Sequence, residues 1–244
     1  MNERQEKILS AIIEEYTQTA IPVGSQVLVG KYKFPVSTAT IRNDMMALEE
    51  EGYLHQPHIS AGRIPTDKGY RYFVEEVMKE KELSKEEQQK MQREFLKLKA
   101  QNTRLTRTTA KLLSHVSGNL VISGNNADFS DFGMRELLDK PEFQEMDEMC
   151  RLVEVLDYID EKFDSLTKDV KEGETKIYIG KENPIGNPNC SMIVSPYKLK
   201  NGEKGILALI GPKRMAYAKN KSLVEYVKKL LGTSAVIILL INVF

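Results

Sequence analysis

The fold is decided by one stretch near the N-terminus, Pro35-Val36-Ser37-Thr38-Ala39-Thr40-Ile41-Arg42-Asn43-Asp44. Ser37 occupies the position of a helix N-cap, and Pro35 keeps the residue before it extended, so a helix with a sharply defined start is expected. One face of this helix is apolar and would be buried: Ile41, Met45, Leu48. The opposite face holds Ala39, Asn43 and Met46, with Thr40 and Arg42 on its flanks. This pattern suits a helix that enters a DNA major groove end-on, and it also suits an ordinary amphipathic surface helix.

Two further helical patterns precede this helix. An apolar stripe with helical spacing comes first: Ile8, Leu9, Ile12, Ile13, Tyr16. Pro22-Val23-Gly24-Ser25 then opens a second, short helix. Three closely spaced helices, the second and third joined by a tight turn, predict a helix-turn-helix.

A wing is expected directly after the third helix. Residues 53–57 are a candidate strand, residues 58–63 a polar turn, and Ile64-Pro65-Thr66 leads toward another helix. Gly62 permits a tight bend and a close backbone approach, which a wing tip beside a sugar-phosphate backbone needs. The order helix, helix, helix, wing, helix predicts a winged helix-turn-helix. Most such domains bind double-stranded DNA, and a minority dock on protein.

The same residues resemble the HrcA family, the bacterial heat-inducible transcription repressors of chaperone operons. The similarity lies in Ala39-Thr40-Ile41-Arg42-Asn43-Asp44-Met45, in residues 48–54, and in the long run His58-Ile59-Ser60-Ala61-Gly62-Arg63-Ile64-Pro65-Thr66-Asp67-Lys68-Gly69-Tyr70-Arg71. It continues in Ile179-Gly180-Lys181-Glu182-Asn183, in Cys190-Ser191, in Gly205 and in Ile210-Gly211-Pro212-Lys213-Arg214-Met215-Ala216-Tyr217. The resemblance covers both ends of the chain and most of what lies between.

The resemblance implies a DNA-binding transcriptional repressor of heat-shock operons. Such a repressor binds an inverted-repeat operator as a homodimer, and its activity is modulated by the chaperonin GroEL. Two other hypotheses stay open. One is a ligand-responsive winged-helix repressor of another operon, and the other is an assembly protein whose winged head docks on protein.

We expect the DNA contacts to come from three groups of residues. Base and nearby phosphate contacts are expected from the start of the third helix: Ser37, Thr38, Ala39, Thr40, Arg42, Asn43. The wing would supply His58, Ser60, Gly62 and Arg63. Lys68 and Arg71 would contact phosphates.

Charge sets a limit on this hypothesis. Residues 1–78 hold eight Lys/Arg and eleven Asp/Glu, a net charge of −3, whereas DNA-binding domains are commonly basic. The charges are segregated, because residues 31–43 carry three basic side chains and no acidic one. We therefore expect DNA binding with modest non-specific affinity.

Residues 79–116 predict a basic linker helix and a possible dimer contact. No Pro or Gly occurs in residues 84–116, and two sets of residues repeat in heptads: Met91, Leu98, Leu105, Leu112 and Phe95, Asn102, Thr109, Val116. One interpretation is a helix that pairs with its twin, with dimer contacts at Met91, Phe95, Leu98, Asn102, Leu105 and Leu112. The other is a linker helix that packs on its own C-terminal domain. The heptads are too few to choose between them.

Residues 117–244 predict a mixed α and β domain. Residues 141–163 read as helical, residues 176–181, 191–199 and 205–210 as strands, and residues 219–231 as a closing helix. The resemblance implies a GAF-like domain here with an inserted dimerising domain. Between Val116 and Asn119 this chain lacks a long stretch of that plan, so a reduced GAF-like domain is expected. The predicted fold class is therefore α+β, with domains at residues 1–78, 79–116 and 117–244.

Enzymatic chemistry is poorly represented in the sequence. No metal-binding box surrounds His55 and His58, and Cys190 lies in a candidate strand without a neighbouring histidine. We expect no enzyme, no cofactor and no metal. Only two cysteines and the lack of a signal-peptide pattern favour the cytoplasm. The apolar tail, residues 233–244, is too short for a membrane span and is expected to be buried or to form part of a dimer surface.

Overall fold

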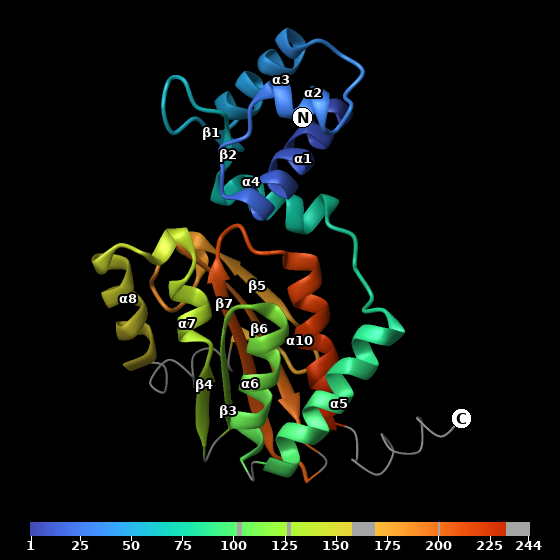
Figure 1. The fold of residues 1–244 in the computed structure, drawn as a ribbon, viewed down its shortest axis with the longest axis vertical. Helices are drawn as coiled ribbons and strands as arrows, with labels where there is room; N and C mark the ends of the chain where they lie inside the picture. The colour runs from blue at the N-terminus through green and yellow to red at the C-terminus, as the bar shows by residue number, and fades with distance from the viewer. Residues whose placement is uncertain (102–103, 126–127, 158–168, 200, 233–244) are drawn as a thin grey trace. The chain divides into compact units, whose positions relative to one another are not determined.

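The computed structural model describes residues 1–101, 104–125, 128–157, 169–199 and 201–232 (Figure 1). These residues form two compact units. The first, here called the head, comprises Met1–Lys79 with Lys213–Ala216, and the second, here called the body, comprises Glu80–Pro212 and Tyr217–Phe244. The fold is α+β, as predicted from the sequence.

The head has the order expected of a winged helix-turn-helix. Its elements are α1 (Glu3–Thr19), α2 (Ser25–Gly30), α3 (Thr38–Glu50), β1 (Leu54–His55), β2 (Ile64–Pro65), α4 (Asp67–Tyr72) and a π-helical turn (Phe73–Val77). The predicted apolar faces are buried in its core: Ile8, Leu9, Ile12, Ile13, Leu28, Ile41, Met45, Leu48. Helices α1 and α3 are also joined by a bidentate pair, in which the Arg4 guanidinium donates to both carboxylate oxygens of the buried Asp44 at 2.7 and 3.1 Å.

The body is built on a five-stranded antiparallel sheet of order β4-β3-β7-β6-β5. Its strands are β3 (Leu120–Asn125), β4 (Phe129–Phe132), β5 (Lys176–Ile179), β6 (Cys190–Lys198) and β7 (Lys204–Pro212). Its helices are α5 (Lys85–Gln101), α6 (Leu105–Ser117), α7 (Met134–Leu138), α8 (Met146–Asp157) and α10 (Tyr217–Gly232), with short 3-10 turns at Pro141–Phe143 and Gly180–Glu182. The β6–β7 hairpin turns at Gly202, whose φ of +86° suits glycine, as the Asn201-Gly202 pair predicts.

The sheet is covered on both faces. Alternate residues of its strands, such as Leu120, Ile122 and Met192, pack against Leu137 of α7 and Leu152 of α8. The intervening residues point to the opposite face, where α6 packs on β3 and β4 and α10 packs on β6 (Figure 1). Strands β3 and β4 and helix α7 had no counterpart among the elements predicted from the sequence.

The prediction of one continuous helix through residues 84–116 is wrong. Helix α5 ends at Gln101, Arg104 has an extended backbone, and α6 begins at Leu105 and packs against α5. The heptad pattern continues across this break because both helices turn an apolar face toward the same interior. Four of the six predicted dimer contacts are buried within the single chain: Met91, Phe95, Leu98, Leu112. Leu105 is half-buried, and Asn102 lies outside the described residues.

The four buried side chains therefore belong to the core of the body and are not available for a dimer contact, whereas a contact at Leu105 or Asn102 stays a prediction. The structure agrees with the alternative interpretation, in which this segment packs on its own C-terminal domain.

The expected helix at residues 141–163 also needs a correction. Residues 141–163 are not one helix, because a 3-10 turn at Pro141–Phe143 precedes α8. Residues 158–163 and the apolar tail at 233–244 lie outside the described residues.

Candidate nucleic-acid interface

The outward face of α3 is exposed as the sequence predicts. Ala39, Arg42, Asn43 and Met46 are exposed and follow one another at helical spacing, while the opposite face is buried. Ser37 caps the helix: its backbone is extended and its hydroxyl accepts a hydrogen bond from the Thr40 backbone N–H at 3.2 Å. The polar start of α3 is thus presented to solvent in a fixed orientation.

Arg42 is positioned by the preceding helix. Its Nε donates to the hydroxyl of Ser25, the first residue of α2, at 3.2 Å. Ser25 is buried, so the bond holds the Arg42 guanidinium at its Nε while the residue as a whole stays exposed. An arginine held in this way loses little freedom when it binds a base or a phosphate.

The wing is built by a residue that sequence reasoning did not single out. Gln56 follows β1, and its side-chain amide donates to the backbone carbonyls of Ile59 and Ala61, both at 2.9 Å. Its backbone N–H donates in turn to Glu49 of α3 at 2.9 Å. Gln56 therefore fixes the shape of the turn and ties it to α3. A glutamine just before a turn is too common a pattern to have revealed this role.

Gly62 has a role within the protein that the sequence did not indicate. Arg63 forms an isolated antiparallel bridge with Val23, and this brings the wing against the segment before α2. A Cβ on Gly62 would lie 2.4 Å from the Val23 carbonyl carbon and 2.7 Å from that of Pro22. The close backbone approach attributed to DNA is therefore used inside the head. A DNA contact at Gly62 stays a prediction.

Arg63 is largely occupied by its own chain. Its side chain is only 13% exposed, and its Nε lies 2.8 Å from Oε2 of Glu49. That distance makes an ion pair, although the Nε–H is not directed at the oxygen as in a hydrogen bond. The carboxylate neutralises much of the field that Arg63 would otherwise offer a phosphate.

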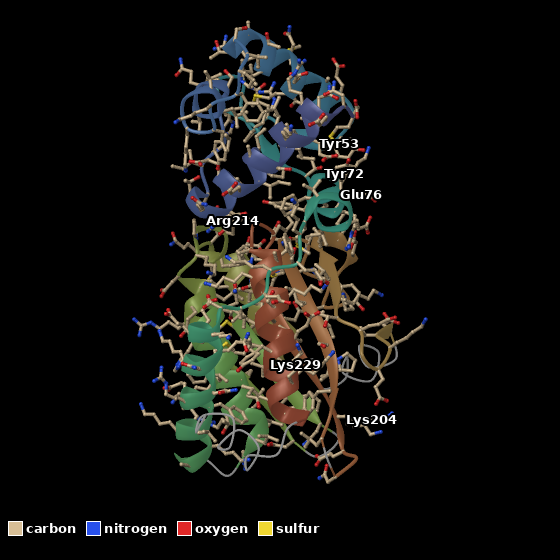
Figure 2. All side chains as sticks on the ribbon, turned by 90° about the vertical axis from the view of Figure 1, so that its right-hand side faces the viewer. Tyr53, Tyr72, Glu76, Lys204, Arg214 and Lys229 are labelled. Atoms are coloured by element: carbon tan, nitrogen blue, oxygen red, sulfur yellow. The ribbon has the colours of Figure 1, made fainter. Side chains whose placement is uncertain are left out.

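Lys68 and Arg71 also have partners within the head. The Lys68 ammonium donates to the Glu51 carbonyl at the end of α3, at 2.7 Å, and lies 4.3 Å from the centroid of the Tyr53 ring. Tyr53 in turn packs edge-on against Tyr72, with 5.5 Å between ring centroids (Figure 2). Arg71 Nη1 lies 3.5 Å from Glu75 on the same helical stretch. The sequence placed these cations near the wing but could not show that each already has a partner.

A groove of about 560 Å³ lies between α3, the start of α2 and the wing. It is bounded by Arg42 and Met46 of α3 on one side and by the wing residues Ile59, Ser60 and Gly62 on the other. Two arginines and no carboxylate are among its lining residues. His58 is exposed at the wing but does not line the groove. The groove therefore brings together four of the twelve predicted contact residues: Arg42, Ser60, Gly62 and Arg63.

Comparison with known proteins identifies the family. The family model described as the HrcA protein C terminal domain matches residues 46–220. The chain belongs to the HrcA family. The heat-inducible transcription repressor HrcA of Pelotomaculum thermopropionicum is 47% identical over 117 residues, and that of Chloroflexus aurantiacus 43% over 123 residues. These alignments span only about a third of each relative, 34% and 33% of its length.

Another HrcA, from Carboxydothermus hydrogenoformans, aligns along nearly its whole length. It is 28% identical over 334 residues, which cover 95% of this chain and 97% of that protein. Because this chain has only 244 residues, at least 90 aligned positions of that HrcA have no counterpart here. Part of the family plan is thus absent, and its location in one long stretch between residues 116 and 119 stays a prediction.

The fold of this HrcA chain is shared with a solved structure. A crystal structure described as that of a hypothetical protein superposes with a TM-score of 0.70 at 21% identity. The match covers 95% of this chain and 97% of that chain. The match shows that the two chains share a fold.

The described part of this HrcA chain contains two free cysteines with contrasting surroundings. Cys190 is buried in β6, and burial, with a smaller contribution from the charge of Glu148, raises the pKa of its thiol to about 12. A thiol of that pKa is protonated at neutral pH and is no nucleophile. Among the described residues, no group of three or more His, Cys, Asp or Glu side chains is arranged to hold a metal, and no helix is long and apolar enough to cross a membrane.

Proposed function

We propose that this chain is a DNA-binding transcriptional repressor of heat-shock operons, those of the chaperonin and other chaperones. It binds an inverted-repeat operator as a homodimer, and the GroEL chaperonin modulates its activity. Two observations support this function: the chain belongs to the HrcA family, and the head has a groove between α3 and the wing.

The observation that carries the proposal is the composition of that groove. Residues 1–78 carry a net charge of −3, yet Arg42 and Arg63 line the groove between α3 and the wing and no carboxylate does. Because Glu49 offsets the charge of Arg63, Arg42 is the main source of positive field in the groove. Polyanions are attracted by local field rather than by total charge. The exposed polar start of α3 forms the part of this surface that would enter the major groove.

The operator hypothesis requires two heads. One head of this size reads a few base pairs, so an inverted repeat calls for two copies related by a two-fold axis. The buried seam of α5 and α6 is not available for the contact, so we expect the dimer to form through another surface of the body. Sedimentation equilibrium at micromolar concentration tests whether the chain dimerises.

Modulation by GroEL requires a repressor that folds with difficulty. Two hydroxyls of the body, those of Thr108 and Ser114, are buried without a hydrogen-bond partner among the described residues. Each such group costs about 1–3 kcal/mol relative to a satisfied one. Refolding yields with and without GroEL test whether folding of the body depends on the chaperonin.

A gel-shift assay tests DNA binding directly. The probe is the DNA upstream of the organism's own chaperonin operon, and the control probe has both halves of its inverted repeat scrambled. Asn43→Ala should weaken binding to the first probe by about 1–3 kcal/mol and reduce the preference between the two. Glu50→Ala, an exposed change on the same helix, is the matched control and should not weaken binding. Equal affinity of the parent protein for both probes would exclude a sequence-specific repressor.

A further inference from the structure

Two large apolar side chains are exposed on the walls of the groove. Ile59 at the wing tip is 100% exposed, and Met46 on the outward face of α3 is 50% exposed. Both line the same groove, one from each side. Neither belongs to the polar contacts expected of a DNA-binding head, and neither packs in the core of the head. Both are therefore accessible to a molecule that enters the groove.

Hydrogen bonds within the wing hold Ile59 in its exposed position. The Ile59 carbonyl accepts a hydrogen bond from the Gln56 side chain, and a second bond from the same amide fixes Ala61. The turn is thus fixed on both sides of its tip. An isoleucine that extends fully into solvent from a fixed turn can be buried on binding without a change in the backbone.

Met46 lies one turn beyond Arg42 and Asn43 on α3. A helix in the major groove brings this face against the base edges, where thymine presents a C5-methyl group and no other base does. A flexible thioether chain adapts well to such a methyl group. Arg42 lines the groove beside Met46 and no carboxylate does, which favours a nucleic acid as the molecule that covers both side chains.

We propose that Met46 and Ile59 form an apolar clamp on duplex DNA, in which Met46 contacts a thymine methyl in the major groove and Ile59 packs on the sugar edge beside the wing. The inference rests on the proposed function, since it names the feature of the operator that the same groove reads. It assigns part of the sequence preference to an apolar contact, in addition to the polar contacts of Arg42 and Asn43.

Thymine-to-uracil scanning of the operator tests the Met46 contact. In a footprinted duplex from upstream of the chaperonin operon, each thymine is replaced in turn by deoxyuridine, which removes only the methyl group. The parent protein should lose roughly fourfold in affinity at one or more positions, the effect of one methyl-sized contact. Met46→Ala should bind the thymine duplex more weakly and lose sensitivity at that position, whereas Met46→Leu should keep it.

Ile59→Ala tests the wing contact. The variant should bind every duplex roughly three- to tenfold more weakly while the slope of affinity against salt stays unchanged, because an apolar contact releases no counterions. Its melting temperature should equal that of the parent, since the side chain is fully exposed. Ile21→Ala is the matched control: Ile21 is 65% exposed in the head but does not line the groove, so affinity should not change.

The outcomes separate the clamp from the function on which it rests. If the parent binds the operator but tolerates every uracil, or if Met46→Ala keeps the full sensitivity, the thymine contact is wrong. Parent-like affinity of Ile59→Ala would overturn the wing contact. If the parent binds neither the operator nor its scrambled control at low salt, the proposed function itself fails, whatever the variants do.

Discussion

Gly62 illustrates how a single residue can link the wing to the rest of the head. Because a Cβ there would lie 2.4 Å from backbone atoms of Val23, Gly62→Ala must push the wing away from the segment before α2. We expect the free energy of unfolding to fall by about 1–3 kcal/mol. Gly24→Ala is the control, since nothing lies within 4 Å of its Cβ position. Urea unfolding of both variants measures the difference, and equal midpoints would contradict the steric argument.

Because Cys190 is buried, we expect the free energy of unfolding of the body to decrease at alkaline pH. Its thiol has a pKa raised by burial to about 12 in the folded chain, against an ordinary value of 9.0. The unfolded chain therefore loses this proton first as pH rises. Stability from this group is complete below about pH 9 and falls between pH 9 and 12, by up to ~1.4 kcal/mol per pH unit.

Cys190→Ala should flatten this alkaline decline in the free energy of unfolding. Cys150→Ala serves as the control, because Cys150 is exposed and its replacement should leave the decline unchanged. Chemical denaturation at several pH values between 8 and 11 measures both. The same decline in the Cys190→Ala variant as in the parent would show that other groups cause it.

At the scale of the element, the sequence predicted those features that depend on a few neighbouring residues, such as the start of a helix. The start of α3 followed from Pro35 and Ser37, and the Ser37 hydroxyl caps the helix as expected. Thr66 likewise caps α4, accepting from the Gly69 backbone N–H at 3.1 Å. The break between α5 and α6 could not be predicted, because the residues around it include no glycine or proline and the apolar repeat runs on through it. A helix and a pair of packed helices have the same periodicity when both face one core.

The packing of α5 on the body leads to a prediction that separates core from dimer. Leu98→Ala removes a side chain that is 5% exposed, so the free energy of unfolding should fall by about 2–5 kcal/mol. The dimer dissociation constant should not change by more than twofold. Lys97→Ala, an exposed change beside it, controls for effects on the helix itself. Dimer loss in Leu98→Ala with an unchanged unfolding midpoint would restore the coiled-coil hypothesis.

At the scale of the whole molecule, the sheet of the body shows where sequence reasoning stops. The three strands β5, β6 and β7 were found because each alternates or runs apolar between turn residues. The order of the strands in the sheet could not be predicted. Strand β3 lies far earlier in the chain, yet it pairs with β7 over six residue positions, from Leu120↔Ile210 to Asn125↔Gly205. Such pairing depends on contacts between distant segments, and no local pattern carries that information. The elements that carry the candidate site were predicted better, since the helix and the wing are contiguous in sequence.

The sequence could not show that most cations of the head are already paired. Lys31 lies against Glu15, Lys7 against Glu3, Arg4 against Asp44 and Arg63 against Glu49. Each pair reduces the number of counterions that the head can displace from DNA. A shallow dependence of affinity on salt is therefore expected of the parent protein.

Glu49→Gln should change that dependence by releasing Arg63. The amide keeps an oxygen that can accept from the Gln56 backbone N–H, so the wing should stay in place while the guanidinium becomes free to contact a phosphate. We expect tighter binding to all duplexes and a salt slope steeper by about one, the contribution of one phosphate contact. The double variant Glu49→Gln with Arg63→Gln should lose the gain, because the cation that causes it is gone. A Glu49→Gln protein with the parent slope would mean that Arg63 does not reach the DNA, and the wing would then bind through its other residues.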